Sequence, residues 1–219
     1  MDYPHAVLAF TGVAVMLTVT PGLDMALVLR STLAHGARHA AATGAGICAG
    51  ALAWGLAAAV GVAALLAASD LAYLVLKAAG AAYLVYLGVT MIRSTFRRAE
   101  ATVAEAVTAA GPARAPARRE RLSRGFVRGL TTNLLNPKVG VFYVAMIPQF
   151  MVPGVTAWLM GLSLAGVHVA LTLVFFAVLI AAAGAFRRFL ASPRATAWVD
   201  RVTGTALIGF GTALAVPSR

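Results

Sequence analysis

The sequence has few charged residues and almost no thiol. Of its 219 residues only 11% are charged, whereas 61% are hydrophobic and the mean hydropathy is +0.86. Soluble domains carry about 25% charged residues, so this chain has too little polar surface to cover its apolar residues in water. The composition excludes a soluble globular protein and a disordered chain, and it indicates a lipid bilayer as the solvent. The single cysteine, Cys48, excludes a disulfide framework and a two-thiol relay within the chain.

Six hydrophobic runs are each long enough to cross a bilayer, which takes roughly 20 residues per helix. We expect spans at about 5–29, 40–68, 71–92, 126–150, 156–186 and 197–216. They must be helices, because a single span in lipid has to satisfy its backbone hydrogen bonds internally. Gly46 and Gly50 in the second run have the GxxxG spacing and predict close helix packing there.

Acidic residues are scarce, with 7 Asp and Glu against 18 Lys and Arg and a net charge of +11. Such an excess can indicate nucleic-acid binding, but here the basic residues lie between the hydrophobic runs. If all six runs cross, 15 of the 18 fall in segments 30–39, 93–128 and 187–201, which share one side. This is the positive-inside pattern. We therefore expect no nucleic-acid partner, an Arg-rich cytoplasmic side and both termini outside.

Residues 94–124 divide the chain into two halves, 1–93 and 125–219, with three spans each. The dividing segment mixes Ala, Pro, Arg and Glu without an apolar period, which predicts an unstructured cytoplasmic linker. The halves resemble one another, since the pattern cation-x-x-Gly-x-Ala occurs at Lys77–Ala82 and at Arg201–Ala206. Because each half has an odd number of spans, equivalent spans of the two halves cross the membrane in opposite directions. The predicted fold class is an all-α integral membrane protein with six transmembrane helices in two inverted three-helix repeats.

Two of the runs contain a helix-breaking proline. The first is interrupted at Thr20-Pro21-Gly22 and the fourth at Asn136-Pro137-Lys138. Proline removes a backbone donor and clashes with the preceding turn, and Gly22 adds backbone freedom. We therefore expect helices 1 and 4 to be broken, with free backbone groups at both breaks that a substrate can use.

One carboxylate and one ammonium follow these breaks. Asp24 comes after Pro21, and Lys138 comes directly after Pro137 near the middle of its run. A charge at mid-span costs about 2.5–3.5 kcal/mol on insertion scales, so such residues usually face an interior or a water-filled path. We hypothesise that Asp24 and Lys138 approach one another as an ion pair that substrate or a proton disrupts. The alternative is that Asp24 extends to the inner interface near Arg30.

Other polar residues complete the predicted substrate and ion site. Thr20, Asn133 and Asn136 offer hydroxyl and amide groups close to the breaks. Lys77 is a further candidate, although its long side chain can instead extend to the outer interface. His168, near the middle of the fifth run, is either a proton acceptor or a hydrogen-bonded packing residue.

Metal ligands and catalytic groups are poorly represented in the sequence. His5, His35 and His39 lie at ends or in loops, and no pair of Cys or His has ligand spacing within a span. We therefore expect no metal site. Nucleophile motifs, phosphate-binding loops and paired catalytic carboxylates are also absent from the sequence, so we do not expect an enzyme.

Several motifs resemble signatures of the LysE/RhtB family of amino-acid exporters. They are Thr20–Val28 (TPGLDMALV), Lys77–Gly88 (KAAGAAYLVYLG) and Asn133–Lys138 (NLLNPK), preceded by Gly125-Phe126 and followed by Phe142-Tyr143 and Pro148-Gln149-Phe150. The match covers essentially the whole chain in order. One departure is Leu23, where the family usually has a second proline. Pro21, Gly22 and Asp24 still match the family pattern.

The resemblance implies a bacterial inner-membrane protein that exports amino acids or related compounds, driven by the proton gradient. It implies no organic cofactor, and it is compatible with a homodimer. Related families move metal cations, so a divalent-cation exporter of the same architecture remains an alternative. A membrane assembly or scaffold protein without transport is a second alternative, although it gives no reason for two charges within the spans.

Overall fold

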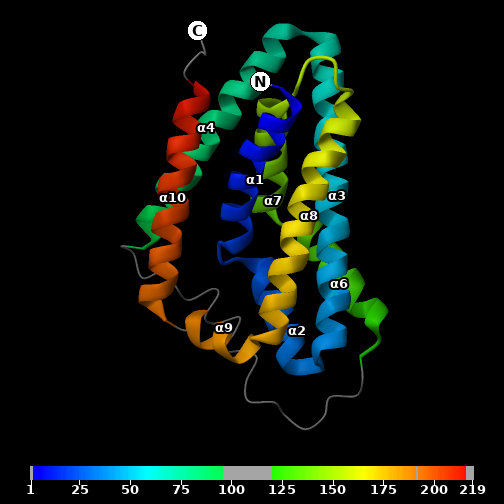
Figure 1. Cartoon of the computed structure of the whole chain (residues 1–219), viewed down its shortest axis with the longest axis vertical. Coiled ribbons are helices and arrows are strands. Elements are labelled where there is room, and N and C mark those ends of the chain that lie inside the picture. Colours follow the sequence, from blue (N-terminus) through cyan, green and yellow to red (C-terminus); the bar gives the residue numbers. More distant parts are fainter. Residues whose placement is uncertain (1, 96–119, 191, 216–219) are drawn as a thin grey trace.

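The computed structural model describes residues 2–95, 120–190 and 192–215, and Figure 1 shows them as a bundle of helices. Within these ranges the secondary structure is entirely helical and contains no strand. The prediction of an all-α protein is therefore confirmed for this part of the chain. Most of the predicted linker, residues 96–119, lies outside the described residues.

The helices follow the predicted runs, with breaks inside several of them. The first half contains α1 (Tyr3–Val19), α2 (Leu23–His35), α3 (Ala37–Ala68) and α4 (Asp70–Ser94). The second half contains α6 (Leu122–Leu134), α7 (Pro137–Met146), the 3-10 turn η1 (Ile147–Phe150), α8 (Ala157–Ala181), α9 (Ala183–Leu190) and α10 (Pro193–Ala215).

By length and apolar composition, three helices qualify as membrane spans: Ala37–Leu65, Asp70–Arg93 and Ala157–Ala181. The bent pair α1 and α2 makes a fourth if it is one span. The second half yields fewer qualifying helices than predicted because its apolar runs are interrupted. Helix α6 is only 13 residues long, and α10 carries Arg194, Asp200 and Arg201 in its first half.

Both predicted helix breaks are present. Helices α1 and α2 meet at an angle of 53° around Pro21 and Gly22. The second break lies at Leu135 and Asn136, where the Asn136 side chain caps α7 by accepting from the Lys138 backbone N–H at 3.1 Å. Pro137 is in the first turn of α7, a position where its missing N–H costs no hydrogen bond.

Some predicted boundaries are wrong. The linker was expected to reach residue 124, but α6 begins at Leu122. The fifth run was expected to continue to 186, but α8 ends at Ala181 and a separate short helix, α9, follows. Arg187 and Arg188 make one face of α9 polar, so this helix is amphipathic and not a continuation of an apolar span.

Glycines allow two helix pairs to pack with their backbones in contact. A Cβ atom at Gly46 of α3 would overlap the carbonyl oxygen of Phe126 in α6, and one at Gly129 of α6 would overlap that of Thr43 in α3. Gly88 of α4 and Gly204 of α10 have the same relationship. The predicted close packing at Gly46 is therefore confirmed, and it joins the two halves of the chain.

Candidate functional site

The two helix breaks meet at a cavity of about 50 Å³ in the middle of the bundle. Polar side chains from five helices and both breaks line it, namely Thr18, Thr20, Asp24, Asn133, Asn136, Lys138, His168 and Thr172. The remaining wall is mostly apolar and includes Leu17, Met25, Ile47, Val139 and Phe176. The structure therefore brings together the predicted site residues from both halves, with the exception of Lys77.

Asp24 is held by an amide from the other half of the chain. It lies in the first turn of α2 and is half-buried. The Nδ2 of Asn133, a buried residue near the end of α6, donates to Asp24 Oδ2 at 2.8 Å. The second oxygen, Oδ1, is buried and accepts no hydrogen bond from the described residues. Asp24 thus keeps an unused acceptor among the residues that line the cavity.

Lys138 contacts the α1 side of the first helix break, whereas Asp24 lies on the α2 side. Its Nζ donates to the Thr20 carbonyl oxygen at 3.4 Å. This carbonyl belongs to the residue that caps the carboxyl end of α1, where free carbonyls carry partial negative charge. The Lys138 ammonium is therefore bound by a backbone carbonyl, a partner that the sequence did not predict.

The predicted direct ion pair between Asp24 and Lys138 is not formed in this conformation. No contact within 4.0 Å joins their charged groups in the described part of the chain. Asn133 takes one oxygen of Asp24, and the Thr20 carbonyl takes the ammonium. Both charged groups line the same cavity, so the prediction was right about the place and wrong about the contact.

His168 and Thr20 connect the cavity to the packed core. His168 of α8 is buried, and its Nδ1 lies 2.8 Å from the hydroxyl of Tyr143 in α7. The Thr20 hydroxyl bonds to the Met16 carbonyl and lies 3.2 Å from the Thr203 hydroxyl of α10. His168 is thus a hydrogen-bonded packing residue that also lines the cavity.

Lys77 lies outside the cavity. It is on α4, and its backbone carbonyl accepts a hydrogen bond from the Gln149 side chain at 2.7 Å. Thr172 and Phe176, which were not predicted, also line the cavity from α8. The signal was present, because His168, Thr172 and Phe176 follow one another at four-residue intervals and therefore share one face of a helix.

The helix ends at the cavity add backbone dipoles to the two charged side chains. Gly22 precedes α2, and no side chain caps the amino end of that helix. Free N–H groups at a helix start favour anions, and free carbonyls at a helix end favour cations. Groups that attract an anion and groups that attract a cation therefore lie at the same cavity.

Comparison with known proteins agrees with the motifs. The sequence model of the family described as LysE type translocator matches residues 15–218. A membrane protein of Bacillus subtilis, uncharacterized and named YrhP, is 29% identical over 94% of this chain and 97% of its own length.

Two further relatives carry functional names. The homoserine/homoserine lactone efflux protein of Salmonella typhi is 33% identical over 66% of this chain and 64% of its own length. The leucine efflux protein of Klebsiella pneumoniae is 26% identical over 92% of this chain and 91% of its own length. No solved structure matches the chain. With its family signature extending over nearly the whole sequence, the chain belongs to the LysE type translocator family.

Proposed function

We propose that this protein is a bacterial inner-membrane secondary transporter that exports amino acids or close derivatives in exchange for protons. Relatives named for leucine, threonine and homoserine efflux support this substrate class. The observation that carries the proposal is the presence of Asp24 and Lys138 in one cavity at two helix breaks.

The cavity chemistry matches both ends of an amino acid. The substrate ammonium binds Asp24 Oδ1, which has no other donor among the described residues. The substrate carboxylate binds Lys138 Nζ and the uncapped amino end of α2. The apolar wall, which includes Ile47 and Phe176, contacts the substrate side chain. A divalent cation fits this site less well, because an ammonium lies beside the one carboxylate.

The size of the cavity implies that transport requires movement. A buried water needs roughly 10–15 Å³ of such space, so a cavity of about 50 Å³ holds a few waters and is too small for a whole amino acid such as leucine. Substrate entry therefore requires the helices around the breaks to separate. Rocking of one half against the other would open the cavity to each side in turn, as in other transporters with broken helices.

Proton coupling follows from competition at Asp24. When Asp24 is ionised, its Oδ1 attracts the substrate ammonium. When a proton occupies this carboxylate, the charge that holds the ammonium is removed. Proton binding from the outside then promotes substrate release there, which is the sequence of events that drives export against a concentration gradient.

The packing of the helices supports the proposed inverted repeat of six spans. Exchange of the two halves pairs α1–α2 with α6–α7, α3 with α8, and α4 with α10. Some packed pairs follow this exchange, since α3 packs on α6 and its counterpart α8 packs on α1, and α3 packs on α7 as α8 packs on α2. Other pairs do not, since α2 packs on α3 whereas the counterpart pair α7 and α8 has little or no contact. The exchange turns the pair α3 and α8 into itself, and it does the same for the pair α4 and α10. Both of these pairs are packed. On this proposal α6–α7–η1 and α10 complete the six spans.

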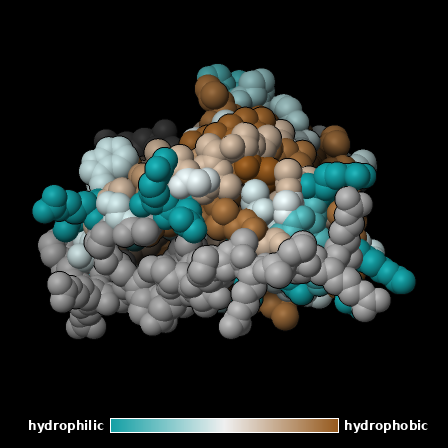
Figure 2. Space-filling view, turned by 90° about the horizontal axis from the view of Figure 1, so that it is seen from below, coloured by the Kyte–Doolittle hydropathy of each residue, from teal (hydrophilic) through white to brown (hydrophobic). Residues whose placement is uncertain are grey.

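The charge distribution supports an orientation with the turn between α2 and α3 in the cytoplasm. This turn and α9 lie at one end of the bundle, whereas α1 begins at the opposite end (Figure 1). Figure 2 shows the first of these ends, where hydrophilic side chains lie beside the apolar body of the bundle. Arg30, Arg38, Arg187 and Arg188 belong to the helix ends that meet there, as the positive-inside rule requires.

Efflux from preloaded cells tests this function. Cells that express the protein are loaded with labelled leucine, threonine, homoserine and other amino acids, or with divalent metal ions, and the loss of label is followed. We expect selective loss of one or a few amino acids that stops when the proton gradient is collapsed. Asp24→Asn should reduce the rate at least tenfold, whereas Asp70→Asn at the start of α4, outside the cavity, should leave it unchanged. Loss of a metal ion alone would contradict the proposal.

A further inference from the structure

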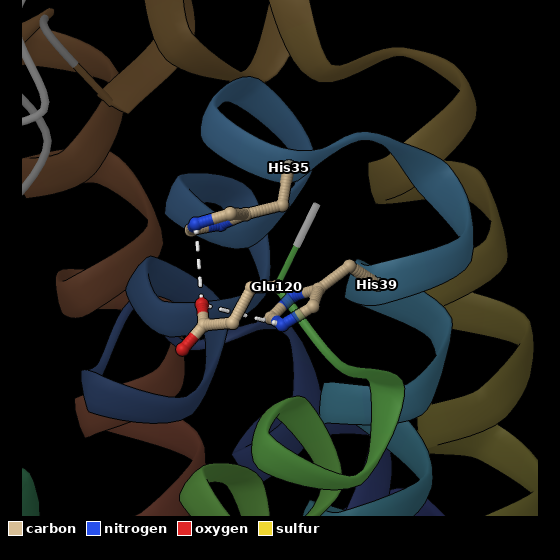
Figure 3. Close-up of side chains that lie close together, drawn as sticks. All are labelled: His35, His39 and Glu120. Carbon is tan, nitrogen blue, oxygen red and sulfur yellow. Dashed lines mark ion pairs between the residues drawn. The ribbon is translucent and has the colours of Figure 1, made fainter. Parts of the chain in front are cut away.

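A second cluster of polar side chains lies away from the cavity, at the end of the bundle where α2 turns into α3. It consists of His35, His39 and Glu120, whose side chains point toward one another (Figure 3). Glu120 Oε2 lies 3.2 Å from His35 Nε2 and 3.4 Å from His39 Nε2. Donor atoms of the three residues all lie within 4.8 Å of one another.

The cluster is shielded from solvent. The side chain of His39 is 3% exposed, that of Glu120 15% and that of His35 21%. His39 Nε2 is buried and has no hydrogen-bond partner within the described ranges, although it lies next to Glu120. A buried ring nitrogen without a hydrogen bond is costly, and a bound ion at this place would remove that cost.

The surroundings fix the groups in the way that metal ligands are usually fixed. His39 Nδ1 lies 2.7 Å from the hydroxyl of Ser31, so its orientation leaves Nε2 facing the carboxylate. Arg128 Nη2 donates to Glu120 Oε1 at 3.2 Å, which leaves Oε2 for the histidines. Hydrogen bonds from such outer groups orient ligands and tune their basicity. The guanidinium also adds a nearby positive charge, which lowers affinity without blocking Oε2.

We propose that His35, His39 and Glu120 form a binding site for a divalent transition-metal ion of the zinc class. Zinc bonds of about 2.0–2.1 Å in tetrahedral geometry separate the ligand atoms by roughly 3.3–3.4 Å. The two measured separations, 3.2 and 3.4 Å, match this spacing. Two imidazoles and one carboxylate are a donor set that zinc accepts, with water in the fourth position.

The ligands come from the first half of the chain and from the residues just before α6, so a bound ion would connect these two parts. His35 ends α2 and His39 is in the first turn of α3, on either side of Gly36, whose φ of 84° allows the sharp reversal. Glu120 precedes α6. The ion would therefore hold the turn between α2 and α3 against the start of α6. This site is distinct from the transport cavity, and the proposal does not depend on the transported substrate.

No metal site was expected from the sequence, because no pair of Cys or His has ligand spacing within a single span. His35 and His39 are four residues apart but belong to two helices, and Glu120 is far away in the sequence. Their proximity depends on the packing of α3 against α6, which no local pattern reveals. A Cβ at Gly125 of α6 would lie 2.9 Å from the His39 ring, so the imidazole is seated directly against that helix.

Cobalt binding tests the proposal without any transport assay. The full chain is purified in detergent without a polyhistidine tag, stripped with a chelator and titrated with Co²⁺, whose tetrahedral complexes absorb strongly in the visible range. We expect one equivalent of tetrahedral Co²⁺ that Zn²⁺ displaces, because zinc binds such sites more tightly than cobalt. Absence of these bands in the wild-type chain would overturn the proposal.

Variants locate the bound ion. His35→Ala, at the more exposed edge of the cluster, and Glu120→Gln each remove a proposed ligand. Loss of a group that only orients a ligand already weakens metal binding about 10–100-fold. We therefore expect each variant to weaken Co²⁺ binding by at least that much. His5→Ala, which removes an exposed histidine near the amino terminus, should leave the bands unchanged. Size-exclusion chromatography confirms that each variant is folded. Unchanged binding in both His35→Ala and Glu120→Gln would show that the ion binds elsewhere and that the cluster is only an acid–histidine contact.

Discussion

Asp24 and Asn133 form a hydrogen bond between residues that lie far apart in the sequence and in different halves of the chain. A charged acceptor inside a membrane protein is costly unless a donor satisfies it. Asn133 supplies that donor from α6, so the first and fourth predicted spans are joined at the residue that we propose binds the substrate ammonium. The same contact leaves Asp24 Oδ1 available.

Replacement of Asn133 measures what this hydrogen bond contributes. Asn133→Ala removes the amide and leaves Asp24 Oδ2 without its donor, and hydrogen bonds to charged groups contribute about 1.5–3 kcal/mol. We expect the free energy of unfolding in detergent to fall by about that amount. Thr131→Ala on the same helix removes an exposed hydroxyl that bonds only within α6, and it should change stability by less than about 0.5 kcal/mol. Equal losses for both variants would contradict this role.

The sequence predicted most of the polar residues that line the cavity, but it did not predict how they contact one another. Asp24, Lys138, Asn133, Asn136 and Thr20 were predicted because polar groups near helix-breaking prolines in apolar runs are unusual. His168 was predicted because it lies near the middle of an apolar run. The partner of Lys138 was not predicted, since the Thr20 carbonyl becomes available only through the geometry of the break. Lys77 follows the same chemical argument as Lys138 but lies on a helix that does not line the cavity.

At the scale of the helices, close packing between α3 and α6 holds the two halves together. It depends on small residues at the contact, because association in lipid relies on van der Waals packing more than on the hydrophobic effect. Gly46 and Gly129 each face a backbone carbonyl of the other helix. This contact continues along both helices from the cavity to the His35–His39–Glu120 cluster.

A pair of glycine substitutions on α3 tests this contact. Gly46→Ala introduces a methyl group that overlaps the Phe126 carbonyl, so α3 and α6 must separate. Overpacking of this kind costs roughly 1–3 kcal/mol, and we expect a lower midpoint of thermal unfolding. Gly61→Ala on the same helix has no atom within 4 Å of the new methyl group. It should be neutral or stabilising by up to about 1 kcal/mol. A Gly46→Ala variant as stable as Gly61→Ala would refute the contact.

The helix breaks were predictable, whereas several helix ends were not. Proline chemistry is local, so Pro21 and Pro137 mark their breaks without knowledge of the fold. The ends of α6 and α8 depend on amphipathic segments beside the apolar runs. There Arg124, Arg128, Arg187 and Arg188 occur within or beside apolar runs, so hydropathy alone does not place the boundary.

At the scale of the whole molecule, the account predicts a fixed orientation in the membrane. The loop between α3 and α4 should face outside, and the turn between α9 and α10 should face the cytoplasm. After Cys48→Ala removes the natural thiol, Ser69→Cys and Ser192→Cys place one thiol in each of these loops. We expect a membrane-impermeant maleimide to label Ser69→Cys in intact spheroplasts and Ser192→Cys only after permeabilisation. The reverse pattern would invert the orientation, and labelling of both in intact spheroplasts would contradict six crossings.

The sequence also predicted the broad class of the molecule from its composition. The family, the all-helical fold and the apolar spans follow from motifs and hydropathy. The arrangement of six spans in an inverted repeat stays a prediction that the symmetric packing of α3, α6, α8 and α1 supports. A homodimer, compatible with the family resemblance, also stays a prediction. A subunit contact is not encoded in a short motif.

The central claim is that Asp24 and Lys138 recognise the two charged ends of an amino acid in one cavity. The most direct measurement is exchange of a labelled substrate in proteoliposomes in competition with the same amino acid, its N-acetyl derivative and its amide. The account predicts that the wild-type protein prefers the zwitterion at least about tenfold over both analogues. Asp24→Asn should lose the discrimination against the N-acetyl form, and Lys138→Met should lose that against the amide. Equal competition by all three compounds in the wild-type protein would contradict it.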